Sequence, residues 1–321
     1  MRQEIGAQQQ DGRAARGGGT APARREDLLI IVRGGIENRL CVHRWAPAAA
    51  SRGTLLCIHG LSTTGLDFEA LAEALAARGL EVVAPDMPGH GRSLWTGSAA
   101  EMGPDGACGR ANVAHCLAGL IRHYAPDPGA RFLLGTSWGA VRLALLLAKR
   151  GMPARRVVLN DLALEAHPFA EETLLRLSIE SELVFETLEE GIACLDRRQR
   201  ELLRNRDSER VAPALLRRYL ASQLMERDGR LVIASRPFRE GMRVVMPAGY
   251  PDMLAILSAI AAERILLLYG SESPYRDSAT QRRILQALPA VRSATIPQAG
   301  HAPRLLTPGE WDLLAEFLLG P

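Results

Sequence analysis

Short apolar runs alternate with helix-like segments along most of the chain. The run at 54–59 is short and continuously apolar, which is typical of a strand that is covered on both faces, and further strands are expected at 81–85, 131–134 and 156–160. Segments with helical spacing follow them. This alternation predicts an α/β fold, a mainly parallel, doubly wound sheet with helices on both faces. The other expected strands lie at 28–32, 40–45, 264–269 and 291–296, and the expected helices at 68–78, 111–124, 138–150, 278–288 and 308–319.

The alternation stops between the two halves of this pattern. Residues 162–262 are rich in charged and helix-favouring residues without a clear strand pattern, so we expect a helical cap (lid) inserted over the sheet. The core then has a first part at 28–161 and a second part at 263–321. Residues 1–27 are rich in Gln, Gly, Ala and Arg, which predicts a disordered tail.

Composition and charge exclude several classes of protein. The chain has 39 Lys and Arg residues against 36 Asp and Glu residues, which leaves a net charge of +3. The basic residues are scattered, so we expect no nucleic-acid partner. No apolar run approaches the roughly 18 residues of a membrane span, so we expect no membrane partner. Lys149 follows Ala148 rather than the glycine of a phosphate-binding loop, which disfavours a nucleoside triphosphatase.

The cysteines lack the paired close spacing of a zinc site. They are odd in number and lie mostly among apolar residues, so we expect free buried thiols in a cytoplasmic protein. No spacing of histidines suggests a metal either, and the sequence predicts no cofactor. The oligomeric state stays open. The five cysteines are Cys41, Cys57, Cys108, Cys116 and Cys194.

A serine lies between two glycines where a strand is expected to pass into a helix. The stretch Gly135-Thr136-Ser137-Trp138-Gly139 follows an apolar run and precedes a helical pattern. A sharp turn at this point crowds the backbone, and glycine removes the clashes that a Cβ would create. The turn would present Ser137 as a nucleophile. The amide of Trp138, at the start of the helix, would face an oxyanion.

Two further motifs follow expected strands. His59-Gly60-Leu61 comes directly after the run at 54–59, where the amide of Leu61 would supply a second oxyanion donor. His301 lies between the last expected strand and the last expected helix, where a general base would reach the serine.

With these motifs in this order, the chain resembles the α/β-hydrolase fold family over roughly residues 28–320. The resemblance implies Ser137 as nucleophile, His301 as general base, and the amides of Leu61 and Trp138 as the oxyanion hole. It also implies that His59 and His90 shape loops. Asp86 is expected to anchor the glycine-rich turn that follows it.

The acid of the triad departs from the commonest pattern of this family. That pattern has Asp three residues beyond the glycine that follows the strand at 264–269, but Ser273 stands there and cannot supply the charge. Asp161, at the end of the preceding expected strand, is favoured as the acid, with Glu272 as the alternative. Asp277, or no acid at all, stays open.

These residues together predict a serine hydrolase that cleaves a carboxylic ester or a similar acyl bond of a small molecule through an acyl-enzyme. A carbon–carbon bond hydrolase, an acyltransferase, or a ligand-binding protein with a weakened triad remain alternatives. Trp138, Met225 and Tyr250 are candidate pocket residues.

Overall fold

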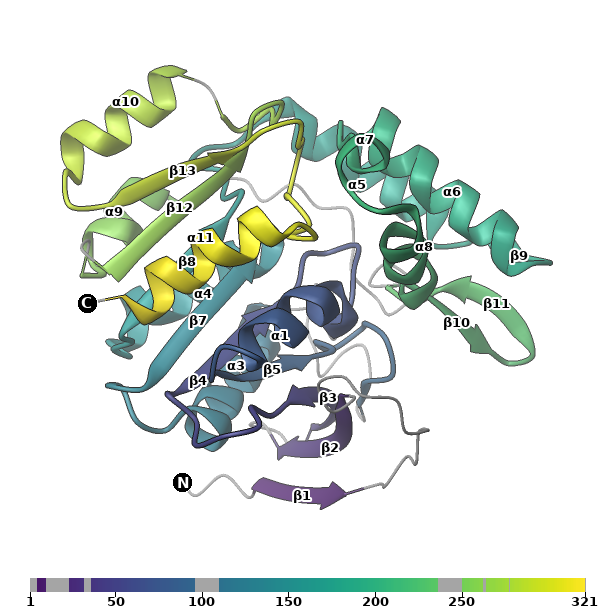
Figure 1. The fold of residues 1–321 in the computed structure, drawn as a ribbon, viewed down its shortest axis with the longest axis horizontal. Coiled ribbons are helices and arrows are strands. Elements are labelled where there is room, and N and C mark those ends of the chain that lie inside the picture. Colours follow the sequence, from purple (N-terminus) through teal and green to yellow (C-terminus); the bar gives the residue numbers. More distant parts are fainter. Residues whose placement is uncertain are drawn as a thin grey trace.

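The structure is a computed structural model that describes residues 5–9, 23–31, 36–95, 110–235, 250–261, 264–276 and 278–320. Within these ranges the chain forms a ten-stranded sheet with helices packed on both faces (Figure 1). In spatial order its strands are β1 (Ile5–Gln9), β2 (Arg24–Ile31), β3 (Glu37–Trp45), β5 (Glu81–Pro85), β4 (Thr54–Ile58), β7 (Arg131–Thr136), β8 (Arg156–Asn160), β12 (Ile265–Gly270) and β13 (Arg292–Ile296), and β6 (Leu94–Trp95) pairs with β3.

The sheet is mainly parallel, as the sequence predicted. Strands β5, β4, β7, β8, β12 and β13 run parallel to one another, and the antiparallel pairs involve β1, β2, β3 and β6. All six residues of β7 and of β12 are buried, because helices cover both faces of these central strands. The carboxyl ends of the parallel strands therefore meet at one edge of the sheet, where side chains from different strands come together.

Two helical layers enclose the sheet (Figure 1). One face packs against α3 (Arg110–Tyr124), α4 (Trp138–Arg150), α9 (Met253–Ser258) and α10 (Ser278–Ala287). The other face packs against α1 (Glu69–Ala76), which follows the 3-10 helix η1 (Gly65–Phe68), and α11 (Pro308–Leu319). Each layer closes a separate apolar core, so the sheet is held rigidly between them.

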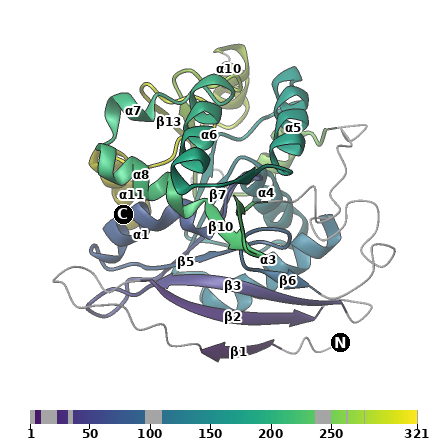
Figure 2. The ribbon, with the colours of Figure 1, turned by 90° about the vertical axis from the view of Figure 1, so that its right-hand side faces the viewer.

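The segment between β8 and β12 lies at one end of the sheet (Figures 1 and 2). It was expected to be a helical cap, but it also contains β9, β10 and β11, which form a small antiparallel sheet. The segment contains α5 (Pro168–Glu180), β9 (Val184–Phe185), α6 (Leu188–Glu201), α7 (Asp207–Arg210), α8 (Pro213–Ser222), β10 (Leu224–Arg227) and β11 (Arg230–Ile233).

The end of this segment also differs from the expected cap. Helix α9 falls inside 162–262, yet Met253 and Leu257 are fully buried in the core against the sheet. The apolar face of α9 therefore belongs to the layer that contains α4, and not to a layer above the sheet.

The expected disordered tail is wrong for residues 5–9 and 24–27. Residues 5–9 form β1 and pair with β2, and β2 begins at Arg24. The carboxylate of Glu26 is buried in β2 and is stabilised by the hydrogen bonds that it accepts from Tyr124 and from Arg44.

No helix in the described ranges is long and apolar enough to cross a membrane.

Candidate active site

Ser137 occupies a strained turn between β7 and α4. Its φ of 50° and ψ of −113° are rare for a residue with a Cβ. The turn is packed so closely that a Cβ added to Gly139 would lie 2.4 Å from the carbonyl oxygen of Ile58. A Cβ at Gly135 would lie 2.7 Å from the Cα of Ala140. Both glycines are therefore required for the serine to stand clear of the sheet.

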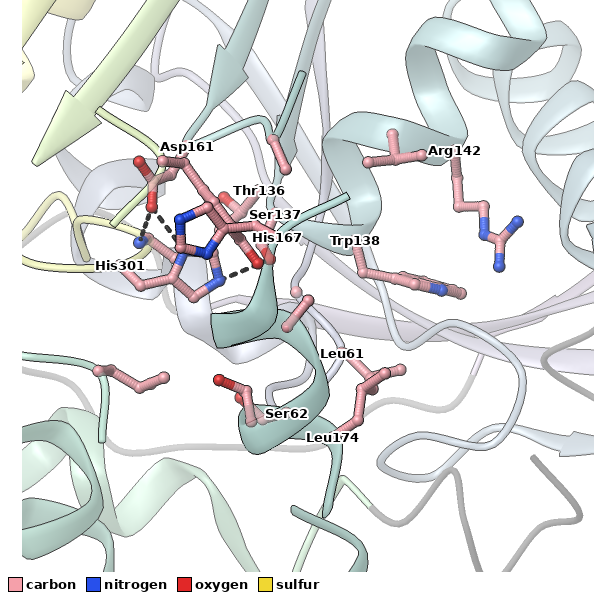
Figure 3. Close-up of a pocket in the computed structure, with 18 of the residues that line it drawn as sticks. Leu61, Ser62, Thr136, Ser137, Trp138, Arg142, Asp161, His167, Leu174 and His301 are labelled. Carbon is pink, nitrogen blue, oxygen red and sulfur yellow. Dashed lines mark hydrogen bonds and ion pairs between the residues drawn. The ribbon is translucent and has the colours of Figure 1, made fainter. Parts of the chain in front are cut away.

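Three side chains form a continuous hydrogen-bonded chain at this turn (Figure 3). The Oγ of Ser137 is 2.8 Å from Nε2 of His301, and Nδ1 of His301 is 2.5 Å from Oδ2 of Asp161. Asp161 is fully buried and His301 is almost so. An Nδ1–H that donates to the carboxylate leaves Nε2 free to accept the proton of the serine hydroxyl.

Asp161 directly follows β8, where a φ of 56° turns its side chain toward His301. Its Oδ2 also accepts hydrogen bonds from the hydroxyl of Ser273 at 2.8 Å and from the backbone N–H of Ala302 at 2.8 Å. Three donors therefore converge on one carboxylate oxygen. These hydrogen bonds fix the orientation of the carboxylate toward His301.

The alternative acid lies elsewhere. Glu272 is paired with Arg206, with 2.8 Å between Oε1 and a terminal guanidinium nitrogen. The structure thus brings Asp161 to His301 and leaves Glu272 in an exposed ion pair. Asp277 lies outside the described residues.

Asn205 holds the loop that carries His301. Its Oδ1 accepts a hydrogen bond from the N–H of Gly300 at 2.9 Å, and its Nδ2 donates to the carbonyl of His301 at 2.9 Å. The N–H of His301 donates to the carbonyl of Leu203 at 2.7 Å. The sequence analysis missed Asn205, because no local motif marks an asparagine whose partners are nearly a hundred residues away. The segment between β8 and β12 therefore holds the loop of His301 in addition to contributing to the lining of the cavity described below.

Aromatic rings limit the rotation of the imidazole. Phe169 and Tyr275 approach the ring of His301 edge-on, with centroid distances of 5.4 and 4.9 Å. Edge-to-face contacts of this kind fix ring orientation in addition to excluding water.

Leu61 and Trp138, whose N–H groups are the expected oxyanion donors, both line the cavity beside Ser137. In the described part of the chain, the N–H groups of Leu61 and Trp138 have no hydrogen-bond acceptor. The loop of Leu61 is held through its carbonyl, which receives hydrogen bonds from the hydroxyl of Ser235 at 2.6 Å and from Nε2 of His90 at 3.0 Å. These two N–H groups are thus left available for a ligand oxygen.

His59 supports the same loop as a neutral side chain. Its Nδ1 donates to the carbonyl of Gly60 at 2.7 Å, and its Nε2 accepts the N–H of Met87 at 3.0 Å. Burial, with a smaller contribution from His90, lowers the pKa of His59 to about 3. A neutral ring that both donates and accepts fits these contacts, so His59 acts as a structural link.

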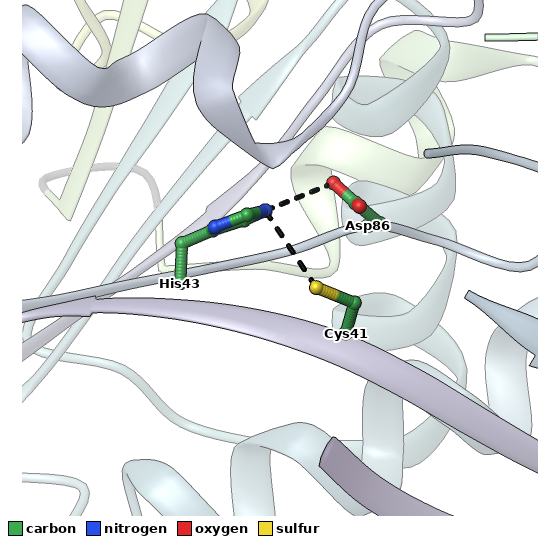
Figure 4. Close-up of side chains that lie close together, drawn as sticks. All are labelled: Cys41, His43 and Asp86. Carbon is green, nitrogen blue, oxygen red and sulfur yellow. Dashed lines mark hydrogen bonds and ion pairs between the residues drawn. The ribbon is translucent and has the colours of Figure 1, made fainter. Parts of the chain in front are cut away.

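Cys41, His43 and Asp86 are the described side chains that lie close enough together to share a metal ion (Figure 4). Nε2 of His43 is 3.9 Å from the Cys41 sulfur and 3.3 Å from the Asp86 carboxylate. Asp86 already accepts the N–H groups of Gly65 and Arg92, both at 2.9 Å. Its carboxylate therefore ties together the loops around the oxyanion site, as expected for the anchor of this turn.

The cysteines form no disulfide within the described residues. Cys41, Cys57, Cys116 and Cys194 are buried free thiols, and Cys108 lies outside the described residues. Burial raises the pKa of Cys57 and of Cys116 far above the usual range, so both remain protonated.

A cavity of about 270 Å³ opens beside Ser137. Its wall is mainly apolar, with Trp138, Val141 and Leu145 contributed by α4 and Leu174 by α5. Tyr250 lines the cavity as the sequence suggested. Met225 does not belong to its lining, because it lies in β10 within the small antiparallel sheet.

Comparisons with known proteins agree with this architecture. Residues 55–312 match the alpha/beta hydrolase family. A 3-hydroxybutyrate-oligomer hydrolase from Cupriavidus necator is 28% identical over 292 residues, which cover 88% of this chain and 94% of that protein.

Two solved structures share the fold. An alpha/beta hydrolase from Novosphingobium aromaticivorans has a TM-score of 0.72 at 23% identity, covering 93% of this chain and 99% of its own. The thioesterase domain from the curacin biosynthetic pathway has a TM-score of 0.66 at 21% identity, covering 93% and 100% of the two chains. From the family match over most of its length, the chain belongs to the alpha/beta hydrolase family and is a hydrolase.

Proposed function

We propose that the protein is a serine esterase that uses Ser137, His301 and Asp161 as its catalytic triad. The observation that carries this proposal is the unbroken hydrogen-bonded chain from the Ser137 hydroxyl to the buried Asp161 carboxylate, at the wall of a cavity. A serine without a base is a weak nucleophile, and a base without an oriented acid keeps neither its tautomer nor its charge.

The reaction begins when the Ser137 oxygen attacks the ester carbonyl carbon and Nε2 of His301 takes the hydroxyl proton. Asp161 stabilises the imidazolium through its bond to Nδ1, and the N–H groups of Leu61 and Trp138 stabilise the oxyanion. His301 then gives its proton to the departing alcohol, which leaves an acyl-enzyme. Water, deprotonated by the same imidazole, releases the acid and restores the serine.

The substrate is proposed to be a small ester with a mainly apolar body. A cavity of about 270 Å³ with an apolar wall suits a short acyl or hydroxyacyl group better than a long chain. The relative from Cupriavidus necator is named for action on 3-hydroxybutyrate oligomers. Short esters of hydroxy acids are therefore the first substrates to assay.

Hydrolysis of 4-nitrophenyl butyrate by wild type and by Ser137→Ala tests this proposal. Ser137→Ala is expected to reduce kcat/KM by about a thousandfold or more, because loss of the nucleophile removes the acyl-enzyme route. Ser258→Ala is a matched control: its hydroxyl is exposed on α9 and bonds its own helix at the Leu254 carbonyl. Equal rates for wild type and Ser137→Ala would contradict the proposal.

A further inference from the structure

His167 lies at the wall of the cavity, directly before the first helix of the segment between β8 and β12. It precedes Pro168, where α5 begins, and it is one of the residues that line the cavity beside Ser137 (Figure 3). The sequence analysis assigned no role to this histidine, and the proposed catalytic steps do not use it. Its place in the lining puts its ring within reach of a bound substrate.

One ring nitrogen of His167 is fixed by the backbone. Nδ1 caps α5 by accepting a hydrogen bond from the N–H of Phe169, with 3.1 Å between the two nitrogens. A backbone N–H can only donate, so Nδ1 accepts and the ring proton lies on Nε2. Nε2 has no hydrogen-bond partner among the described residues. His167 therefore presents an N–H donor for which the described part of the chain supplies no acceptor.

Tyr275 holds the ring of His167 and links it to the general base. The ring centroid of Tyr275 is 5.6 Å from that of His167 and 4.9 Å from that of His301, and both contacts are edge-to-face. A single aromatic ring thus lies between His167 and the base. The cap and this contact together orient the imidazole, which reduces the entropy that is lost when Nε2–H binds a ligand.

The surroundings of His167 favour an uncharged oxygen as the acceptor. The cavity wall is mainly apolar, and Glu165, two residues before His167, also belongs to the lining. An anionic group beside His167 would be repelled by that carboxylate. Arg142 lines the cavity from α4, and Figure 3 places it far from His167 on the side of Trp138. A hydroxyl oxygen therefore suits the donor of His167 better than a carboxylate does.

We propose that Nε2–H of His167 donates a hydrogen bond to a hydroxyl on the acyl group of the substrate, so that the enzyme prefers esters of short hydroxy acids. This inference rests on the proposed esterase function and names the residue that selects its substrate class. The acyl group stays bonded to Ser137 after the alcohol departs, so a fixed donor in the wall can hold it through both steps. A hydroxyl on the third acyl carbon lies three bonds from the scissile carbon, which suits a donor close to the base.

The test compares the two enantiomers of ethyl 3-hydroxybutyrate with ethyl 3-methylbutyrate, in which a methyl group of similar size replaces the hydroxyl. Each kcat/KM is divided by the rate constant for alkaline hydrolysis of the same ester, which corrects for intrinsic reactivity. In wild type, one enantiomer is expected to exceed ethyl 3-methylbutyrate by about fivefold, the effect of one neutral hydrogen bond. Equal corrected values for all three esters would overturn the inference without the use of any variant.

Two substitutions of His167 separate recognition from capping. In His167→Asn, the side-chain oxygen replaces Nδ1 as a good N-cap, but no donor reaches the position of Nε2. In His167→Gln, the longer amide reaches the position of Nε2 with a donor and leaves the cap unmade. The fivefold preference is expected to be lost in His167→Asn and largely kept in His167→Gln. A role in capping alone predicts the reverse order, because only His167→Gln loses the cap.

Thr187→Asn is the matched control. Thr187 caps α6 by accepting the N–H of Glu190, and it lies outside the described lining of the cavity. This variant is expected to keep the preference of wild type. Retention of the preference in His167→Asn, or its loss from both His167 variants, would overturn the assignment. Undiminished cleavage of ethyl 3-methylbutyrate by Ser137→Ala would instead overturn the proposed function.

Discussion

Replacement of Asp161 by Asn is the most informative single change in the proposed triad. The carboxylate is fully buried, and three donors converge on its Oδ2, from His301, Ser273 and Ala302. Asn keeps the shape and one acceptor oxygen but removes the negative charge. The variant therefore separates the charge of residue 161 from its packing.

The size of the effect follows from the charge that develops on His301. Two unit charges about 4 Å apart interact by about 4 kcal/mol at an effective dielectric constant of about 20. Each 1.36 kcal/mol changes a rate about tenfold, so loss of this interaction predicts a decrease in kcat of about a thousandfold.

The assay is steady-state hydrolysis of 4-nitrophenyl butyrate, with thermal unfolding as the check that each variant is folded. Glu272→Gln is the matched control, since Glu272 pairs with Arg206 at the surface and is expected to change kcat by less than about twofold. A decrease of less than tenfold in Asp161→Asn, or a larger effect in Glu272→Gln, would refute the reasoning.

Three further outcomes are expected. Ser273→Ala removes one hydrogen bond to a buried carboxylate and should lower kcat about tenfold, since such bonds contribute about 1.5–3 kcal/mol; an unchanged kcat would count against this role. Gly139→Ala places a Cβ 2.4 Å from a carbonyl oxygen and should lower the free energy of unfolding by about 1–3 kcal/mol in a urea titration; wild-type stability would contradict the packing argument. The pKa of His59 falls to about 3 in the folded protein from an ordinary value of 6.5, so the unfolded state binds more protons between these pH values, and stability should decrease as pH falls from 6.5 toward 3. His59→Gln should flatten that dependence when unfolding free energies at pH 7 and pH 5 are compared, and an unchanged slope would contradict it.

The parallel core could be predicted because its signal is local. Buried strands such as β7 and β12 contain short apolar runs, and the glycines around Ser137 mark a turn that only glycine permits. The turn at Ser137 and the alternation of strands and helices along the chain could therefore be predicted from short stretches of sequence.

The missed strands carried a weaker signal. Residues Asp228 and Gly229 both have positive φ and form the tight turn between β10 and β11, and an Asp-Gly pair is a known hairpin signal. The flanking strands have four residues each and include charged side chains. The helix-favouring composition of the segment therefore led to the prediction of helices there, despite the turn. Secondary structure there is set by pairing within a small sheet.

The supporting residues of the site were beyond the reach of sequence patterns. Ser273 was set aside because it cannot supply a charge, yet its hydroxyl donates to the acid. Asn205 contacts the loop of His301 across 96 positions of sequence. Contacts of this kind depend on tertiary structure and leave no periodicity along the chain.

The central claim is that Ser137 is an activated nucleophile, and a fluorophosphonate probe tests it most directly. Intact mass and peptide mapping after reaction should place one label per chain on Ser137, with labelling strongly slowed in His301→Ala and absent in Ser137→Ala. A folded wild-type protein that stays unlabelled, or that carries its label on another residue, would contradict the account.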